Sequence, residues 1–472
     1  MITSSFNCAM DGLCSVSAAS AAAARPALLS FHFQSVVHTS PLRANIIAVK
    51  VPALCASRTR TMLGCTSASS TITTPTWEQL VTELGEHTQE PFRLSHAKTR
   101  LFGSSAPTLT FYRDNSSWCP YCQRVWLQLE EKQIPYEVEK INMNCYGKKP
   151  DWYLEMIPSG LLPAVKLGER VIPESLDIMM ILEQSFPQHK SLLPSESSPE
   201  KKAYVSILLK QERRLLGAWL SCLRGGMWGS MNSFSKALDD ANTSLMKFGG
   251  PYFLGQEFSL VDAVYAPFLE RIAASSPYWV GVQVRGTDRW PALNAWFDAM
   301  DTRPAYQAMK SDDFTITHTL EPQIGKCRLL PEGAAYRAKI DGKDGSWSLP
   351  LKPETTAWGY DDGTGVGNAK QEAAKSLINN HEAIVKFAMR AFVNFEDSTA
   401  ASVDEGFRIV SHALLTGVEN VRESSLNLSK DVALAAAYLR DRVGVPRDLT
   451  YPAARQLRAH LQWLVKSLGS DL

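Results

Sequence analysis

Four consecutive residues, Cys119-Pro120-Tyr121-Cys122, have the types and the spacing of a thiol redox site. An apolar run ending at Tyr112 precedes them and an amphipathic run over 125–129 follows, which predicts a strand, a turn and a helix. A cysteine at a helix N-terminus is stabilised as the thiolate, because the helix dipole and the free N–H groups favour negative charge. Cys119 is therefore expected to be the nucleophile, and Cys122 can resolve a mixed disulfide.

Other roles for this cysteine pair remain open at this point. Half of a zinc site would need a second ligand pair, yet the later cysteines, Cys145, Cys222 and Cys327, are isolated and have no histidine nearby. Two buried structural cysteines are another alternative. The cysteine content of the whole chain is too sparse for a disulfide scaffold. Redox chemistry is the better interpretation, and we expect no metal site.

The elements expected to position the pair follow the order β-α-β-α-β-β-α over residues 105–186. Alternating β-rich residues predict a strand over 136–141. Another strand, over 164–167, is entered through Pro163, where a cis peptide bond is expected. A short strand and a helix beginning near Ser175 complete the unit. A Cys-x-x-Cys after the first strand and a proline before the third predict a thioredoxin-like α/β domain.

Over residues 105–310 the chain resembles a glutathione transferase of the cysteine type, related to the omega, lambda and dehydroascorbate-reductase classes. The matching stretches are Trp118–Arg124, Lys149–Trp152, Pro158–Ala164 and Pro173–Ser175. The resemblance implies glutathione as co-substrate. It also implies that the thioredoxin-like domain over 105–186 is followed by an all-helical domain over 200–310. Within that domain, Ser259 as a cap and Asp262 at the third helical position predict the start of a helix that continues over 263–272.

The same resemblance implies which residues hold glutathione. Leu162 would offer its backbone N–H and C=O to the cysteinyl part. Glu174 and Ser175 would hold the γ-glutamyl ammonium and carboxylate, and Lys149 would pair with the glycyl carboxylate. The chemistry is suitable, since a carboxylate binds an amine and a helix N-terminus binds an anion. Each has a structural alternative, because Glu174 and Ser175 could cap a helix and Lys149 could be an ordinary surface charge.

A cysteine in this position argues against conjugation, since it forms a mixed disulfide with glutathione. Many omega-like enzymes keep only the first cysteine, so Cys122 permits a dithiol route beside the monothiol one. The resemblance implies a thiol transferase or reductase for a small disulfide or electrophilic substrate, dehydroascorbate included. Trp118 and Trp219 are candidate linings of the second-substrate pocket, and packing in the core is an equally good alternative for Trp219. The alternative is a carrier or scaffold whose glutathione site binds a ligand or an iron–sulfur cluster, acting through the C-terminal extension.

The N-terminal segment 1–65 has the composition of an organelle transit peptide. It is rich in Ser and Ala and contains one acidic residue, Asp11, against basic residues at 25, 43, 50, 58 and 60. The bias favours the chloroplast (plastid stroma) over the mitochondrion, with a disordered cytosolic extension as the alternative. The segment 66–104 is a lead-in. No run reaches the roughly 18 apolar residues of a membrane span, and the formal net charge of +1 suggests no nucleic-acid partner.

Residues 311–472 form an extension that ordinary glutathione transferases lack. Its first part is Gly/Pro-rich, with a β-hairpin predicted from strands over 336–340 and 346–349. Its second part is helical, with apolar stripes over 377–395 and in helices starting near Ser429 and Pro452. Such stripes need a partner surface, so a helical bundle or packing onto the transferase body is expected.

The extension also bears on partners and subclass. His381, His412 and His460 could meet as metal ligands, but no further ligand stands near them at a suitable spacing. An extension on a Cys-Pro-x-Cys transferase with a plastid address is similar to the iota class of photosynthetic organisms. The family implies a homodimer, although a segment of this size could cover the usual interface, and the extension could itself bind a protein partner.

Overall fold

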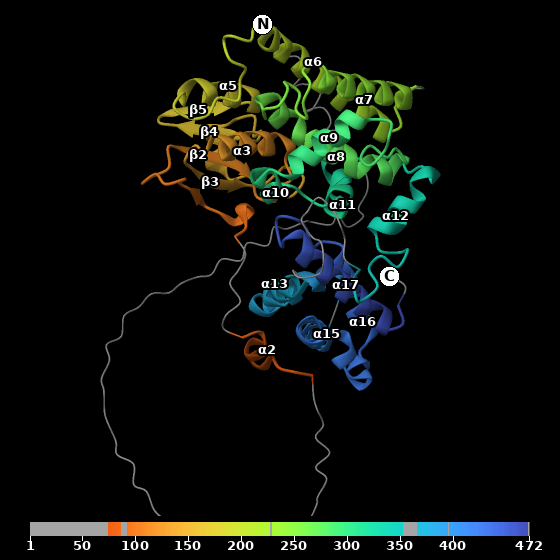
Figure 1. The fold of residues 1–472 in the computed structure, drawn as a ribbon. Helices are drawn as coiled ribbons and strands as arrows, with labels where there is room; N and C mark the ends of the chain where they lie inside the picture. Colours follow the sequence, from red (N-terminus) through yellow and green to blue (C-terminus); the bar gives the residue numbers. More distant parts are fainter. Residues whose placement is uncertain (1–73, 86–91, 227–228, 353–365, 395, 471) are drawn as a thin grey trace, which may run out of the picture.

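The computed structural model describes residues 74–85, 92–226, 229–352, 366–394, 396–470 and 472 (Figure 1). The expected transit peptide and Phe395 lie outside these residues. None of the helices in the described part of the chain is long and apolar enough to cross a membrane.

A five-stranded mixed sheet forms the first layer, in the order β1-β3-β2-β4-β5. Its strands are β1 (Thr99–Arg100), β2 (Leu109–Asp114), β3 (Tyr136–Ile141), β4 (Ala164–Leu167) and β5 (Arg170–Pro173). The central β2 runs parallel to β3 and antiparallel to β4. The parallel pair requires a crossover connection, which α3 provides. The thioredoxin-like α/β domain predicted from the sequence is confirmed.

Three helices accompany this sheet: α3 (Pro120–Lys132), α4 (Asp151–Met156) and α5 (Ser175–Ser185). Pro120 occupies the first turn of α3, where its missing N–H costs no hydrogen bond, and Cys119 is the N-cap residue. Val125, Trp126 and Leu129 of α3 are fully or almost fully buried. Their burial anchors the helix whose first turn carries the cysteine pair.

The second, all-helical layer packs onto α3 through α8. Its helices are α6 (Pro199–Leu223), α7 (Ser230–Met246), α8 (Leu260–Val280), α9 (Pro291–Asp301), α10 (Pro304–Met309) and α11 (Asp313–Ile324). Ser259 and Asp262 form a capping box at the start of α8, as predicted. The apolar cores of the two layers are continuous, since residues of α3, α6 and α8 belong to one buried cluster.

Although α11 falls within residues 311–472, it packs against α8, so residues 311–324 are counted with the transferase body from here on. The rest of the extension is mainly helical and lies below these two layers in Figure 1. It comprises α12 (Ala334–Ile340), α13 (Val366–Asn379), α14 (His381–Ala388), α15 (Asp397–Thr416), α16 (Lys430–Arg440) and α17 (Tyr451–Ser467). Helices α13 to α17 enclose a separate apolar core. The N-terminal helix α2 (Trp77–Leu84) joins this core through Leu80, although the whole transferase body separates it from α13 in the sequence. The sequence alone indicates only a lead-in there.

One prediction for the extension is wrong. The β-hairpin is absent from the described residues: Tyr336–Ile340 belongs to α12, and Trp347 lies so close to Gly342 that an added Cβ would clash with the indole ring. Residues 336–340 have alternating polarity, but the three alanines of α12 favour a helix. The predicted apolar stripe over 377–395 is divided between two helices, because α13 stops before Asn380, which is the N-cap residue of α14. The buried positions Leu377 and Ile384 nevertheless share the predicted core.

Candidate functional site

The cysteine pair lies at the junction of β2 and α3, as the sequence predicts. Cys119 is 7 % exposed and Cys122 is 1 % exposed, and both are free thiols. The pKa of Cys119 is lowered, chiefly because Cys122 donates a hydrogen bond to its sulfur, while burial opposes the shift. Burial raises the pKa of Cys122 well above its usual value, and its hydrogen bond to Cys119 adds to the rise. The two thiols are therefore differentiated into a nucleophile and a proton donor.

A buried carboxylate that the sequence analysis missed lies beside the two sulfurs. Asp114 is 1 % exposed, and one of its oxygens comes within 4.8 Å of both sulfur atoms. Oδ2 accepts the backbone N–H of Trp118 at 2.7 Å, whereas buried Oδ1 has no hydrogen-bond partner. Asp114 is the last residue of β2 and shortly precedes Cys119. A carboxylate at the end of that strand is the sequence feature that could have identified it as a site residue.

The loop before β4 brings Leu162 to the nucleophile. The Leu162 carbonyl oxygen lies 4.0 Å from Cys119 Sγ. The predicted cis peptide bond between Leu162 and Pro163 is confirmed. This places backbone polar groups of an extended segment next to the thiol, where a peptide-like co-substrate could pair with them.

Glu174 and Ser175 stand at the N-terminus of α5. Glu174 is exposed and adopts φ 65°, a left-handed conformation that is costly for a residue other than glycine and that clusters at functional sites. Ser175 is buried and its hydroxyl accepts a hydrogen bond from Arg124 Nε at 2.9 Å. Arg124 lies on α3 shortly after Cys122, and burial lowers its pKa. A buried cation beside Ser175 suits a carboxylate, so Arg124 joins the candidate site.

Lys149 approaches the same site from the loop before α4. Its Nζ donates to Asn144 Oδ1 at 2.8 Å. Its stem runs past Gly160, where an added Cβ would lie 3.5 Å from Lys149 Cδ. Gly160 is close to Leu162 in the chain, so Lys149 lies beside the loop that reaches Cys119.

Neither tryptophan fits the expected role of lining a second-substrate pocket. Trp118 is 3 % exposed and Trp219 is 2 % exposed. The Trp219 indole donates to Ser275 Oγ inside the helical core, whereas the Trp118 indole donates to Val445 O of the extension at 3.2 Å. Trp118 is thus covered by a segment near the other end of the chain, which local patterns could not reveal.

Comparisons with known proteins agree with this geometry. Residues 118–185 match the family model of the glutathione S-transferase N-terminal domain, and residues 229–299 match that of the C-terminal domain. Glutathione S-transferase L2, chloroplastic, from Arabidopsis thaliana is 31% identical over 229 residues, which are 48% of this chain and 71% of that protein. The chain belongs to the glutathione S-transferase family. Glutathione is therefore the co-substrate of this transferase.

Two further relatives show the breadth of the family. Glutathione S-transferase DHAR2 from Arabidopsis thaliana is 32% identical to the transferase over 208 residues, 44% of this chain and 90% of that protein. Pyrimidodiazepine synthase from Drosophila melanogaster is 33% identical over 201 residues, 40% of this chain and 76% of that protein. Neither family model extends past residue 299, so the extension lies outside the matched domains of the transferase.

The three extension histidines contact different partners in the transferase. His381 stacks on Trp77 with ring centroids 4.4 Å apart, and His412 lies 3.1 Å from Glu83. His460 is buried, its Nδ1 is 2.7 Å from the Gln456 carbonyl, and burial lowers its pKa to about 4. A shared metal site for these histidines does not form among the described residues.

Proposed function

We propose that the chain is a plastid glutathione-dependent thiol transferase that uses Cys119 as its nucleophile. The single observation that carries the proposal is the position of Cys119 as the N-cap residue of α3, beside Cys122 and Leu162, where its pKa is lowered. A thiolate is the reactive form for thiol–disulfide exchange. The plastid address rests on the composition of the N-terminal segment 1–65 and is supported by chloroplastic relatives.

The four predicted glutathione contacts have suitable chemistry, and one of them, Leu162, lies beside the nucleophile. Leu162 would pair with the backbone of the cysteinyl part. Glu174 would accept the γ-glutamyl ammonium group, and Ser175 with Arg124 would bind its carboxylate. Lys149 would pair with the glycyl carboxylate. Together they would set the glutathione sulfur in line with Cys119, and such positioning supplies a large part of a rate enhancement.

In the monothiol route, the Cys119 thiolate attacks the glutathionyl sulfur of a mixed disulfide. The bond between glutathione and the substrate thiol breaks, and the substrate leaves as a thiolate that takes up a proton. A second glutathione thiolate then attacks the Cys119 mixed disulfide, which forms oxidised glutathione and frees Cys119. With dehydroascorbate, the thiolate would instead add to a carbonyl carbon. A glutathione thiolate would then attack the Cys119 sulfur and break its bond to carbon, so that ascorbate leaves and a Cys119–glutathione mixed disulfide remains. A second glutathione would reduce this disulfide and free Cys119.

In the dithiol route, Cys122 attacks the Cys119 sulfur and expels glutathione as a thiolate. The Cys122 thiol must first lose a proton, and burial disfavours this loss. The partnerless Oδ1 of Asp114 is suited to accept that proton, directly or through one water. Asp114 can then pass it to the departing glutathione thiolate. The products are the Cys119–Cys122 disulfide and glutathione.

The test is glutathione-dependent reduction of a small mixed disulfide by the full chain and by two serine variants. Cys119→Ser should lower the rate by about a thousandfold or more, because the nucleophile is lost. Cys122→Ser should retain a good part of it through the monothiol route. Equal loss in both variants would contradict that route. No activity in the unmodified chain, with glutathione still binding, would instead favour the carrier or scaffold function.

A further inference from the structure

A loop of the extension, Val443–Asp448, lies directly on Trp118, the residue before the nucleophile. The Val445 carbonyl accepts the indole N–H of Trp118 at 3.2 Å. The Arg447 guanidinium lies 4.6 Å from the centroid of the same indole. Gly444 packs so closely that an added Cβ would stand 2.5 Å from Trp118 Cζ2. We refer to residues 443–448 as the clasp.

The clasp is itself fixed to the transferase body by buried polar contacts. Val445 N donates to Thr315 Oγ1 at 3.0 Å, and the Ser311 hydroxyl donates to the Val445 carbonyl. On the other side, Ser95 Oγ donates to the Pro446 carbonyl at 2.6 Å. Arg458 of α17 donates to the Val443 carbonyl at 2.6 Å and forms a buried ion pair with Asp312. The clasp is therefore held from both the body and the extension.

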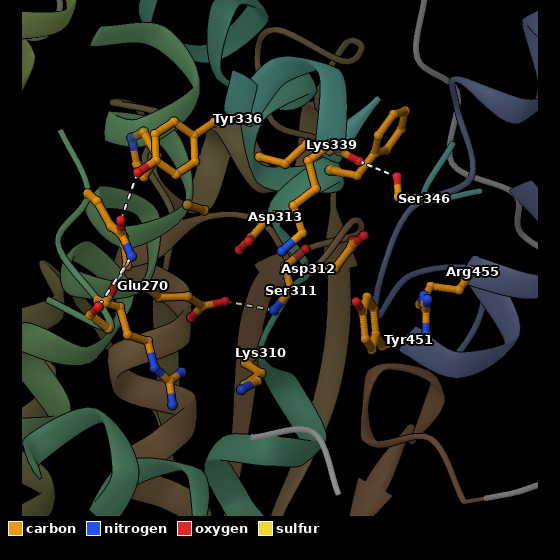
Figure 2. Close-up of a pocket in the computed structure, with 18 of the residues that line it drawn as sticks. Glu270, Lys310, Ser311, Asp312, Asp313, Tyr336, Lys339, Ser346, Tyr451 and Arg455 are labelled. Carbon is orange, nitrogen blue, oxygen red and sulfur yellow. Dashed lines mark hydrogen bonds between the residues drawn. The ribbon is translucent and has the colours of Figure 1, made fainter. Parts of the chain in front are cut away.

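Ser311 links the clasp to a second polar path toward the catalytic turn. Its backbone N–H donates a hydrogen bond to the Glu270 carboxylate (Figure 2). Both residues line a cavity of about 520 Å³ between the body and the extension. The other Glu270 oxygen accepts Gln123 Nε2 at 2.6 Å, and Gln123 Oε1 accepts Arg271 Nη1 at 2.8 Å. Arg271 also donates to the Trp118 carbonyl at 2.7 Å. Both the indole and the carbonyl of Trp118 are thus tied to residues at this interface.

The turn that Trp118 terminates needs such anchors. Ser117 has φ 63°, a left-handed conformation that is costly for serine and persists only where the surroundings enforce it. Asp114 binds the backbone N–H of Trp118, and Arg113 Nη1 donates to Ser117 Oγ at 3.0 Å. These groups all belong to the body. The indole ring, the largest group in the turn, is contacted by the clasp and also, edge to face, by Tyr146 of the body.

We propose that the clasp is part of the catalytic apparatus: through Trp118 it positions Cys119 against Cys122 and the N-terminus of α3. Trp118, Val445 and Arg447 are positioning residues, since none is placed at the reacting atoms. The inference rests on the proposed thiol-transfer function and gives the extension a role in it. The residues proposed to hold glutathione lie on segments other than the clasp, namely the loops before α4 and β4, the start of α5, and α3 itself. A disturbed clasp should therefore alter the nucleophile and leave glutathione binding intact.

Gly444→Ala in the full chain tests the inference, because the new Cβ must displace the Trp118 ring. Gly406→Ala is the matched control: its Cβ would stand 2.5 Å from Val432 Cγ1, within the extension core and away from Trp118. The pH profile of Cys119 alkylation reports the thiolate directly. Gly444→Ala should raise the apparent pKa of Cys119 and reduce kcat for mixed-disulfide reduction by about tenfold with KM for glutathione unchanged, since small misplacements have large kinetic effects.

An unchanged alkylation profile in folded Gly444→Ala, or an equal change in Gly406→Ala, would overturn the proposal. If Gly444→Ala fails to fold, Trp118→Phe removes the hydrogen bond to Val445 from the other side. Its control, Trp219→Phe, loses a buried indole hydrogen bond within the body. Only Trp118→Phe should shift the profile, and an unshifted profile would contradict the inference. Alkylation does not require turnover, so an inactive unmodified chain would refute the proposed function while leaving the positioning test valid.

Discussion

The transferase body and the extension are stabilised internally in the same way but are joined by different forces. Each encloses its own apolar core, one around Trp126 and Leu269 and the other around Phe407 and Leu461. Between them, the contacts include the buried Arg458–Asp312 ion pair and the hydrogen bonds of the clasp. Apolar burial is non-directional, whereas buried polar groups need specific partners. We therefore expect the ion pair and the clasp hydrogen bonds to fix the orientation of the extension relative to Cys119.

The largest effect on this comparison should come from breaking the buried ion pair. Arg458→Met leaves Asp312 as an uncompensated buried carboxylate, which we expect to reduce the free energy of unfolding by about 3–5 kcal/mol. Thermal unfolding of the full chain measures it. Arg408→Met, which removes a more exposed partner of Asp404, should cost at most about 1 kcal/mol. Similar losses in the two variants would contradict the role given to the interface.

Glu212, a buried carboxylate within the body, should affect stability differently from Asp312, because its buried Oε1 has no hydrogen-bond partner. Burial raises the pKa of Glu212 to about 7, above its ordinary value of 4.5. The unfolded chain therefore loses this proton first, and the stability of the unmodified protein should fall as the pH rises from about 4.5 to 7. Glu212→Gln lacks this titration. The free energy of unfolding of this variant should exceed that of the unmodified protein by up to about 3 kcal/mol between about pH 5 and 8.

Denaturant unfolding of both proteins at several pH values checks the Glu212 prediction. Parallel stability profiles would contradict it, since they would mean that Glu212 ionises normally in the folded state. Asp312, paired with Arg458, provides the contrasting case of a buried carboxylate with a direct cationic partner.

Asp114→Asn tests whether the body alone supplies the proton acceptor for Cys122. Asparagine can still accept the Trp118 N–H but cannot take a proton. We expect the release of glutathione from glutathionylated Cys119 to slow by about tenfold or more, since a positioned base contributes at least that much. Stopped-flow measurement of released glutathione gives the rate.

The control for Asp114 is the same substitution in the Cys122→Ser background. There the dithiol route is absent, so Asp114→Asn should leave the glutathione-driven rate nearly unchanged. An equal effect in both backgrounds would show that Asp114 acts on Cys119 or on the fold, and not on Cys122.

The smallest effect should come from Lys149→Ala. Loss of an exposed contact to a carboxylate is worth about 1 kcal/mol, so KM for glutathione should rise roughly five- to tenfold while kcat stays similar. Lys148→Ala removes a neighbouring exposed charge and should leave KM unchanged. Equal changes in both variants would indicate a general electrostatic effect in place of a specific contact.

The sequence predicted the parts of the molecule whose structure is encoded locally. The Cys-x-x-Cys turn, the order of helices and strands along residues 105–186 and the Ser259 capping box depend on residues close in the chain, and all are confirmed. Asp114 and Arg124 lie in the same segment, but their importance depends on which side chains they meet in space. The clasp could not be predicted, because Val445 and Trp118 are brought together only by tertiary structure.

The errors have the same physical origin. Tyr336–Ile340 has the alternation of a strand, but packing of Trp347 against Gly342 and Phe314 accompanies a helix instead. The sequence of helix α2 shows only a short amphipathic segment. The helix joins the extension core by packing on α13 and α15, and both follow the whole transferase body in the chain. Periodicity identifies which face of an element is apolar and does not identify the surface that covers it.

The most direct test of the central claim is to locate the glutathione that becomes attached to the protein. The Cys122→Ser full chain is treated with oxidised glutathione, digested and analysed by mass spectrometry. Cys119 should carry the glutathionyl group in preference to Cys145, which is exposed but lies in a turn and not at the start of a helix. Modification confined to Cys145, or none at all, would contradict the assignment of Cys119 as the nucleophile.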